Sequence, residues 1–402
     1  MRRARRGQRQ GPPRGFMTPR GFDPIAGAPP SRTEDLRHMR EALAVAPRGQ
    51  GRVSPNPLVG AVVARGNQVF GTGWHAEYGG DHAEVMALRE AGPRAKGATL
   101  YVTLEPCRHH GHTPPCTTAI IRSGVRRVVI ACRDPNPEAR HGAEELRQAG
   151  LDVEIGIEEN AAKRLNAAFL WFHRRWVPFA SLKLALSLDA KLGEESVRTP
   201  VTGIRALDEV HRLRSCHDAI LIGSNTIEID DPLLTARGEV VPRVPPIRAI
   251  LDTTLRLRIS SQLVRTASQA PVWAFADPES DGFEERAGAL LDAGVEVIEV
   301  ARSEDHRLDL SAVWNEMAIR GVLSVLVEGG GQVAASLLRG GHIQRIHAFI
   351  APMFYGRDGV PAFPGLEPST PGDWLPVQRE SLGQDTQIVF EHRELQETLD
   401  NL

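Results

Sequence analysis

Several features that would place the chain in other protein classes are scarce or missing. Only four of its 402 residues are cysteine, too few for a disulfide framework at this length. No apolar run approaches the roughly 18 residues of a membrane span, and the first residues lack the apolar segment of a secretory signal. The sequence therefore predicts a cytoplasmic protein with no membrane partner, whose clustered cysteines would serve as metal ligands.

The net charge of the chain is close to zero, and the charged residues are unevenly distributed. Residues 1–30 hold seven arginines and one aspartate, which leaves 41 basic and 49 acidic side chains for the rest of the chain. An acidic remainder gives no electrostatic footprint for nucleic acid. The Arg/Gly/Pro-rich stretch 1–31 is expected to be a disordered tail. Its two interpretations are a nucleic-acid or membrane arm and an inert tail, since Met17 could equally begin the protein.

The remaining chain alternates strand and helix patterns, which predicts two α/β domains, at 32–176 and 177–402. In the first, a helix is expected from about Thr33 to Val45, and a hairpin turns at a Gly-Asn pair. Asp81 is a plausible N-cap for the next helix. Residues 158–175 are expected to form one amphipathic helix that joins the domains. In the second domain, apolar runs predict a mostly parallel sheet closed by a final pair of strands.

A set of metal-binding residue types occurs in the first domain. His82 and Glu84 form a His-Ala-Glu triplet, and Cys107 and Cys116 follow, the first directly after a proline. Zinc binds imidazole and thiolate, and a catalytic site keeps one position open for water. In the H-x-E…P-C pattern of zinc deaminases the glutamate is an acid/base group and not a ligand. His82, Cys107 and Cys116 are thus predicted zinc ligands, and Glu84 the catalytic residue. His109, His110 and His112 remain alternative ligands or loop residues.

The stretch YVTLEPCRHHGHTPPC, together with PNPLVGAVV, DPNP, DDPLLTAR, VEGGGQVAASLL and FIAPMFYG, resembles the bifunctional deaminase/reductase family of riboflavin biosynthesis. Eight residues separate its cysteines, where ordinary cytidine-type deaminases have two. The resemblance covers about Thr33 to Arg393. It implies a cytidine-deaminase-like three-layer domain followed by a dihydrofolate-reductase-like domain, zinc and NADPH as cofactors, a phosphorylated pyrimidine as substrate, and a homo-oligomer.

The resemblance also implies site residues. Gly329 and its neighbours follow an apolar strand and begin a helix, an arrangement that suits a cofactor pyrophosphate. A tight structural turn would have the same sequence pattern. The implied cofactor contacts are Ala185, Pro200, Thr226, Asp230, Thr253, Gly330, Gly331, Gln332, Val333, Ala334, Ala335 and Ser336. The implied substrate contacts are Asn56, Arg214, Leu234, Arg237 and Glu328.

The chain departs from the family at positions in both domains. Pro200 stands where the family has tryptophan beside the cofactor, and the preceding segment is one residue short, so its substrate serine is unassigned. Arg108 and His112 replace the commoner Ser and Arg. Two alternatives follow: a deaminase whose second domain no longer reduces, and a nucleic-acid-editing deaminase guided by the Arg-rich tail. The acidic remainder argues against the second.

Overall fold

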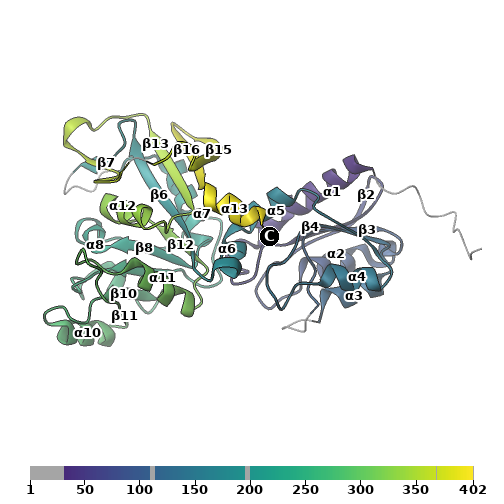
Figure 1. Cartoon of the computed structure of the whole chain (residues 1–402), viewed down its shortest axis with the longest axis horizontal. Helices are drawn as coiled ribbons and strands as arrows, with labels where there is room; N and C mark the ends of the chain where they lie inside the picture. The colour runs from purple at the N-terminus through teal and green to yellow at the C-terminus, as the bar shows by residue number, and fades with distance from the viewer. Residues whose placement is uncertain (1–30, 109–113, 195–199, 368, 402) are drawn as a thin grey trace, which may run out of the picture.

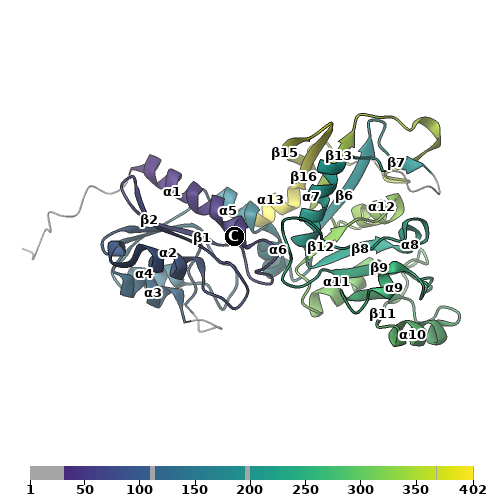
Figure 2. The ribbon, with the colours of Figure 1, turned by 180° about the vertical axis from the view of Figure 1, so that it is seen from behind.

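The computed structural model describes residues 31–108, 114–194, 200–367 and 369–401 as two lobes joined end to end (Figures 1 and 2). Both lobes are layered α/β structures, and the C-terminal helix returns to lie between them. Within these residues, no helix is both long and apolar enough to cross a membrane. The predicted tail falls on residues 1–30, which lie outside the described residues, whereas Ser31 already caps the first helix.

The first lobe has a five-stranded sheet in the order β2-β1-β3-β4-β5. The predicted hairpin is confirmed, since β1 and β2 pair antiparallel across Gly66 and Asn67. The strand β1 is also antiparallel to β3, and β3, β4 and β5 run parallel. The strands are β1 Gly60–Arg65, β2 Gln68–Trp74, β3 Thr99–Leu104, β4 Arg127–Cys132 and β5 Asp152–Ile155.

Helices cover both faces of this sheet and make a three-layer structure. Met39 and Ala42 of α1 pack with the α5–α6 region on one face. On the other face lie Ala87 of α2, Ile120 of α3 and Leu146 of α4. The helices are α1 Arg32–Val45, η1 Ala46–Gly49, α2 Ala83–Ala91, η2 Gly92–Ala95, α3 Cys116–Ser123 and α4 Gly142–Gln148, with α5 Glu159–Leu165 and α6 Ala167–Arg175 following.

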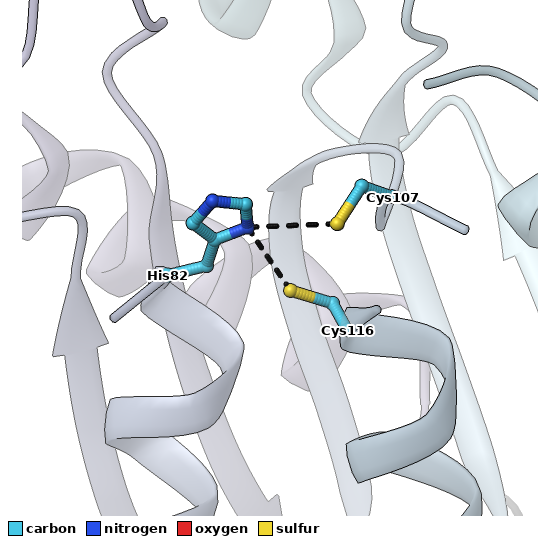
Figure 3. A group of neighbouring side chains, drawn as sticks. All are labelled: His82, Cys107 and Cys116. Atoms are coloured by element: carbon cyan, nitrogen blue, oxygen red, sulfur yellow. Dashed lines mark hydrogen bonds between the residues drawn. The ribbon is translucent and has the colours of Figure 1, made fainter. Parts of the chain in front are cut away.

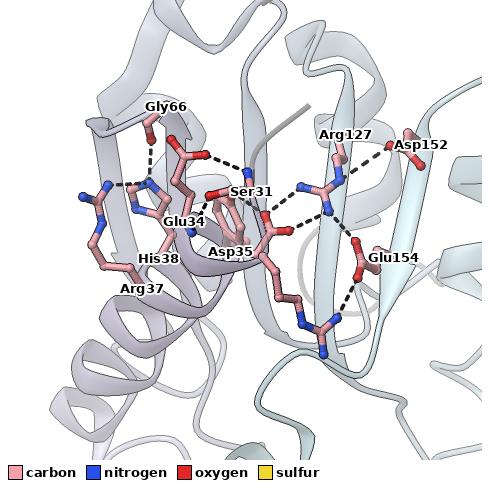
Figure 4. Close-up of polar contacts among 11 residues, drawn as sticks. Ser31, Glu34, Asp35, Arg37, His38, Gly66, Arg127, Asp152 and Glu154 are labelled. Atoms are coloured by element: carbon pink, nitrogen blue, oxygen red, sulfur yellow. Dashed lines mark hydrogen bonds and ion pairs between the residues drawn. The ribbon is translucent and has the colours of Figure 1, made fainter. Parts of the chain in front are cut away.

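A buried polar network attaches α1 to the sheet (Figure 4). Ser31 and Glu34 form a capping box at the helix start, which satisfies two backbone N–H groups that the first turn leaves without partners. Asp35 accepts two hydrogen bonds from Arg127 of β4, at 2.7 and 2.9 Å. Arg127 also pairs with Glu154 of β5. The first helix of the lobe is thereby tied to β4 and, through Arg127, to the edge strand β5.

The prediction of a single helix over 158–175 is wrong, because the structure has two helices separated by a break at Asn166. The backbone of this residue is not helical, at φ −108° and ψ 24°. Its side chain is the reason. The Asn166 amide accepts from the Leu58 N–H and donates to the Leu58 carbonyl, both at 2.8 Å. An asparagine that pairs with another segment's backbone competes with helix continuation.

The second lobe has a nine-stranded sheet in the order β11-β10-β9-β8-β12-β6-β13-β16-β15. The predicted mostly parallel sheet is confirmed: all pairs from β11 to β13 are parallel. The predicted closing pair, β13 with β16, is antiparallel, and β15 adds a further edge strand. The strands are β6 Phe179–Ser187, β8 Ala219–Gly223, β9 Ile247–Leu251, β10 Val272–Ala276, β11 Glu296–Glu299, β12 Ser324–Val327, β13 Arg345–Ala351, β15 Trp374–Leu382 and β16 Asp385–His392; β7 Lys191–Glu194 and β14 Gly359–Pro361 form a separate pair.

Helices cover this sheet too, and the last helix crosses to the first lobe. Leu395 and Leu399 of α13 join the hydrophobic cluster that holds Met39, and Glu394 pairs with Arg175 of α6 at 2.9 Å. The end of the chain therefore stabilises the junction of the lobes. The helices are α7 Ile204–Ser215, α8 Ser224–Asp230, α9 Gln262–Arg265, α10 Phe283–Asp292, α11 Leu310–Ile319, α12 Gly331–Arg339, η3 Gly356–Asp358 and α13 Arg393–Asp400.

Candidate active sites

Three metal-ligand side chains meet at one end of the first lobe's sheet (Figure 3). His82 is the N-cap of α2, Cys107 follows β3, and Cys116 is the first residue of α3. The His82 Nδ1 lies 3.1 Å from the Cys116 Sγ and 3.6 Å from the Cys107 Sγ. The three ligand atoms all fall within 4.8 Å of one another. Sequence spacing alone predicted this group, and the fold brings its members together.

The donor set fits a zinc ion. Ligands at 2.0–2.3 Å on a tetrahedron lie roughly 3.5–3.8 Å apart, close to the separations seen here. One imidazole and two thiols leave the fourth position for water. The pKa of the Cys107 thiol is lowered to about 4 by hydrogen bonds with Cys116 and His82, and a thiolate is the form that binds metal.

Glu84 lies two residues after His82, in the first turn of α2. It is the second residue of α2 and only 3% exposed. Burial raises the pKa of its carboxyl group above the ordinary value, although the charge of His82 opposes the shift. A raised pKa makes the carboxyl group a stronger proton acceptor, as general acid–base catalysis requires. Asp81, predicted as the N-cap, is not one, because the helix begins after His82 and the Asp81 carboxylate pairs with Arg89 instead.

A cavity of about 200 Å³ opens beside these residues. Asn56 lies in it, and its amide is 3.1 Å from the Nε2 of His75. The other ring nitrogen of His75 is 3.2 Å from the Asp81 carbonyl, and burial lowers the pKa of the ring. His75 is thus held neutral in a fixed orientation. The lining is Asn56, Pro57, Val59, His75, Tyr78, Gly79, Gly80, His82, Glu84, Leu104, Glu105, Cys107, Asp134, Asn136, Ala139 and Phe169.

Five polar lining residues were not assigned from the sequence: His75, Tyr78, Glu105, Asp134 and Asn136. Glu105 accepts backbone hydrogen bonds from Asp134 and Ala143, at 3.3 and 3.0 Å. Burial raises the pKa of Asp134 to about 7. The DPNP motif at the end of β4 was the available signal for Asp134 and Asn136, because polar residues that follow a buried strand tend to line the site at the sheet edge. The alternative ligands His109, His110 and His112 lie outside the described residues.

The second lobe contains a larger cavity of about 1280 Å³. It lies where β8, β9 and β12 end and where α8 and α12 begin, an arrangement that suits an anionic cofactor. A Cβ atom on Gly331 would come within 2.7 Å of the Pro361 carbonyl, so only glycine allows this approach. Ten of the implied cofactor residues line the cavity: Ala185, Pro200, Thr226, Asp230, Thr253, Gly330, Gly331, Gln332, Val333 and Ser336.

The other implied residues of this lobe are placed elsewhere. Ala334 and Ala335 are fully buried, and Leu234 is 4% exposed. Ala334 and Leu234 belong to hydrophobic clusters. Arg214 and Glu328 pair with each other at 2.6 and 2.8 Å. Arg237 is exposed, and its guanidinium donates to the Thr235 hydroxyl. The shortened segment that precedes Pro200 lies outside the described residues.

Lys183 is a lining residue that sequence reasoning missed. It lies on β6 and faces the cavity. Burial lowers the pKa of its ammonium group, while the negative charges of Glu328 and Asp230 oppose that shift. Its only sequence signal was a lysine within the otherwise apolar run SLKLALSL, since a charged residue in a buried strand needs a partner or a function. Arg256, Arg307 and Arg339 also line this cavity.

Together, the first lobe and its His/Cys/Cys ligand set define a zinc-dependent deaminase. The second lobe and its cavity define a nucleotide-cofactor domain. The family model for the cytidine and deoxycytidylate deaminase zinc-binding region matches residues 32–132. The model for the RibD C-terminal domain matches residues 178–388. The chain belongs to the RibD family of riboflavin biosynthesis proteins.

Relatives match along both lobes. The riboflavin biosynthesis protein RibD of Synechocystis is 42% identical over 329 residues, which are 81% of this chain and 87% of the relative. The solved structure of Acinetobacter baumannii RibD has a TM-score of 0.79 at 31% identity and covers 90% of this chain and 99% of its own. The Thermotoga maritima diaminohydroxyphosphoribosylaminopyrimidine deaminase/5-amino-6-(5-phosphoribosylamino)uracil reductase has a TM-score of 0.78 at 32% identity, with the same coverage.

These matches confirm the predicted fold class, a deaminase-like lobe followed by a RibD reductase lobe. The chain is a bifunctional enzyme of riboflavin biosynthesis, with a deaminase and a reductase activity and with zinc and NADPH as cofactors. Full-length relatives favour this function over the alternative of a deaminase joined to an inactive second domain.

Proposed function

We propose that the chain deaminates 2,5-diamino-6-(5-phosphoribosylamino)pyrimidin-4(3H)-one in its first lobe and reduces the ribosyl group of the product in its second. The observation that carries this proposal is the pairing of two unlike sites in one chain. One is a His/Cys/Cys donor set beside a buried glutamate, and the other is a large cavity at a glycine-rich helix start. Residues 32–176 would form the deaminase unit and residues 177–402 the reductase unit. The helix α13 belongs to the second unit in sequence but packs against the first lobe.

In the deaminase site, His82, Cys107 and Cys116 would hold zinc. When bound, the metal lowers the pKa of a water molecule and so supplies hydroxide near neutral pH. Glu84 would accept a proton from the attacking water and pass it to the amino group that leaves as ammonia, so that a C–O bond replaces the C–N bond and one water is consumed. The buried carboxyl group is suited to both steps because its pKa is raised. Asn56 and the neutral His75 orient the pyrimidine ring.

In the reductase site, the backbone N–H groups at Gly330 and Gly331 would hold the cofactor pyrophosphate, and Thr226, Thr253 and Ser336 would add hydroxyl donors. When bound, NADPH supplies hydride to the ribose carbon. The ring C–O bond breaks, and the oxygen takes a proton. Lys183 is the group placed to donate this proton, because it lines the cavity and its pKa is lowered by burial. Arg214, Leu234, Arg237 and Glu328 are proposed to bind the substrate.

The proposal extends to the setting of the enzyme. Its partner is a small phosphorylated pyrimidine and not a nucleic acid, it works in the cytoplasm, and it assembles as a homo-oligomer. The acidic balance of residues 31–402 supports the first point, because binding to nucleic acid relies on clustered positive charge.

Mass spectrometry of the reaction products tests both activities. The purified chain is incubated with the diaminopyrimidine phosphate alone, with NADH and with NADPH. Without a dinucleotide, the product gains about one mass unit, because hydrolysis replaces NH₂ by OH and releases ammonia. With NADPH, a further two hydrogens are added, and NADH supports this step poorly. An unchanged substrate would contradict the deaminase assignment. Deamination with neither dinucleotide supporting reduction would favour the inactive second domain.

A further inference from the structure

We infer that Arg243, a residue of the reductase lobe, is a positioning residue for the deaminase site. It lies in the loop between α8 and β9, and that loop reaches across to the first lobe. The inference rests on the proposed function, because it concerns how the deaminase pocket is held open for its substrate. It extends that function because deamination in the first lobe would depend on a side chain of the reductase lobe.

Four contacts of Arg243 join the lobes. Its guanidinium carbon lies 5.0 Å from the ring centroid of Tyr78, over the ring face. Its Nε donates to the Arg52 carbonyl at 3.2 Å, and its Nη2 donates to the Ser54 carbonyl at 2.9 Å. Its own backbone N–H donates to the Gly51 carbonyl at 2.7 Å. One residue therefore contacts two separate segments of the deaminase lobe, residues 51–54 and Tyr78.

One of these segments lines the deaminase cavity, and the other leads directly to a lining residue. Tyr78, Gly79 and Gly80 line it directly. The Tyr78 N–H donates to the Arg52 carbonyl at 3.1 Å, so that this one carbonyl accepts from Tyr78 and from Arg243. Two residues after Ser54 comes Asn56, whose amide is bonded to His75 inside the cavity. A shift of the 51–54 segment would thus move both the tyrosine rim and the Asn56 amide.

The fit between this segment and the reductase lobe is close. Gly51 has a positive φ of 72°, and a Cβ atom there would come within 2.8 Å of the Ser215 carbonyl and 3.3 Å of the Pro242 backbone. The Ser54 hydroxyl donates to Asp218 at 2.5 Å. Asp218 is itself held, because its other carboxylate oxygen accepts from the backbone N–H groups of Leu323 and Ser324. The deaminase segment therefore sits on a rigid part of the second lobe.

The contact of Arg243 with Tyr78 is what separates positioning from simple attachment of the lobes. Attachment is already provided by α13, whose leucines are buried in the first lobe's core. Arg243 is itself solvent-exposed, and Tyr78 is 37% exposed. Removal of the Arg243 side chain should leave the fold intact and free the rim to move. The variant loses the cation–π contact with Tyr78 and two charge-assisted hydrogen bonds as well.

The test uses the full chain with Arg243→Ala, Arg243→Lys, Tyr78→Ala and the double variant Arg243→Ala/Tyr78→Ala. The expected result for Arg243→Ala is a rise of roughly 3- to 20-fold in the KM of deamination, with a smaller change in kcat. Zinc content, thermal midpoint and reduction of pre-deaminated substrate should match the parent. Lysine keeps the charge over the ring and should recover part of the loss. Arg258→Ala, at an exposed arginine of the same lobe, is the matched control.

The double variant distinguishes the proposal from two independent effects. If Arg243 acts through Tyr78, the double variant should have nearly the KM of Tyr78→Ala alone, because coupled residues do not add. Fully multiplicative effects, or a KM for Arg243→Ala equal to that of Arg258→Ala, would overturn the inference. A parent enzyme that does not deaminate would instead contradict the proposed function. A lowered thermal midpoint with parental KM would assign Arg243 to attachment of the lobes and overturn its positioning role.

Discussion

Arg214 and Glu328 form a two-pronged ion pair in the reductase lobe, with the Nε and Nη2 of the arginine 2.6 and 2.8 Å from the two carboxylate oxygens. The side chains are 12% and 7% exposed. Burial alone would raise the pKa of Glu328, but the charge and hydrogen bonds of Arg214, together with the charge of Lys183, outweigh burial and the pKa is lowered. Both residues were implied as substrate contacts, and the structure shows that each is also the other's partner.

The pair predicts a large stability cost when one partner is neutralised. Glu328→Gln leaves the Arg214 charge largely buried without its carboxylate, and such losses cost about 3–5 kcal/mol. Urea unfolding of the reductase lobe measures it. Glu209→Gln is the control, because Glu209 pairs with Arg212 on the same helix and that arginine is 40% exposed; such pairs are worth about 0–1 kcal/mol. Equal losses for the two variants would contradict the special role of the buried pair.

Metal removal should separate the two activities. A chelator strong enough to strip zinc is expected to abolish deamination, while reduction of pre-deaminated substrate continues, since the predicted ligands lie in the first lobe. Added zinc should restore deamination. Cys107→Ala should contain well under one zinc per chain by elemental analysis, whereas Cys132→Ala, at a buried cysteine of β4 outside the ligand group, should keep it. Full zinc content in Cys107→Ala would exclude Cys107 as a ligand.

Glu84→Gln should remove proton transfer without removing the metal. General acid–base groups are worth about 10²–10⁴-fold in rate, so kcat for deamination should fall by that factor. Zinc should stay bound, because Glu84 is outside the donor set of His82, Cys107 and Cys116. Glu145→Gln on α4 is a matched control that should behave as the parent. Loss of reduction in a folded, zinc-loaded Glu84→Gln protein would show that the two sites are not independent.

Acid should destabilise the second lobe through His217. Burial lowers the pKa of its ring to about 4, whereas in the unfolded chain the value is near 6.5. Between these values the unfolded state binds a proton that the folded state does not, so the free energy of unfolding falls as the pH drops from about 6.5 to 4. His217→Gln should lose less stability between pH 7 and pH 5 than the parent. His306→Gln, at an exposed histidine, should lose as much as the parent, and identical profiles for all three proteins would contradict the assignment.

Local chemistry made the zinc group predictable. His82, Cys107 and Cys116 are recognisable because a metal demands particular donor atoms, and the pattern places them at helix starts and strand ends where parallel strands bring them together. The strands themselves were equally readable, because buried strands of a parallel sheet are continuous apolar runs. The order of these features along the chain was enough to indicate two layered α/β domains.

The tertiary structure decided what depends on partners distant in sequence. Asn166 breaks a helix because it pairs with Leu58. The N-cap of α2 is His82 and not Asp81. The helix α13 packs beside Met39 of the first lobe. Lys183 faces a cavity only because β6 lies between β12 and β13. Arg243 meets Tyr78 only because two lobes dock. Each of these outcomes is a contact between segments more than a hundred residues apart or a choice between competing local partners, and periodicity along one segment carries no information about which distant group will occupy the neighbouring space.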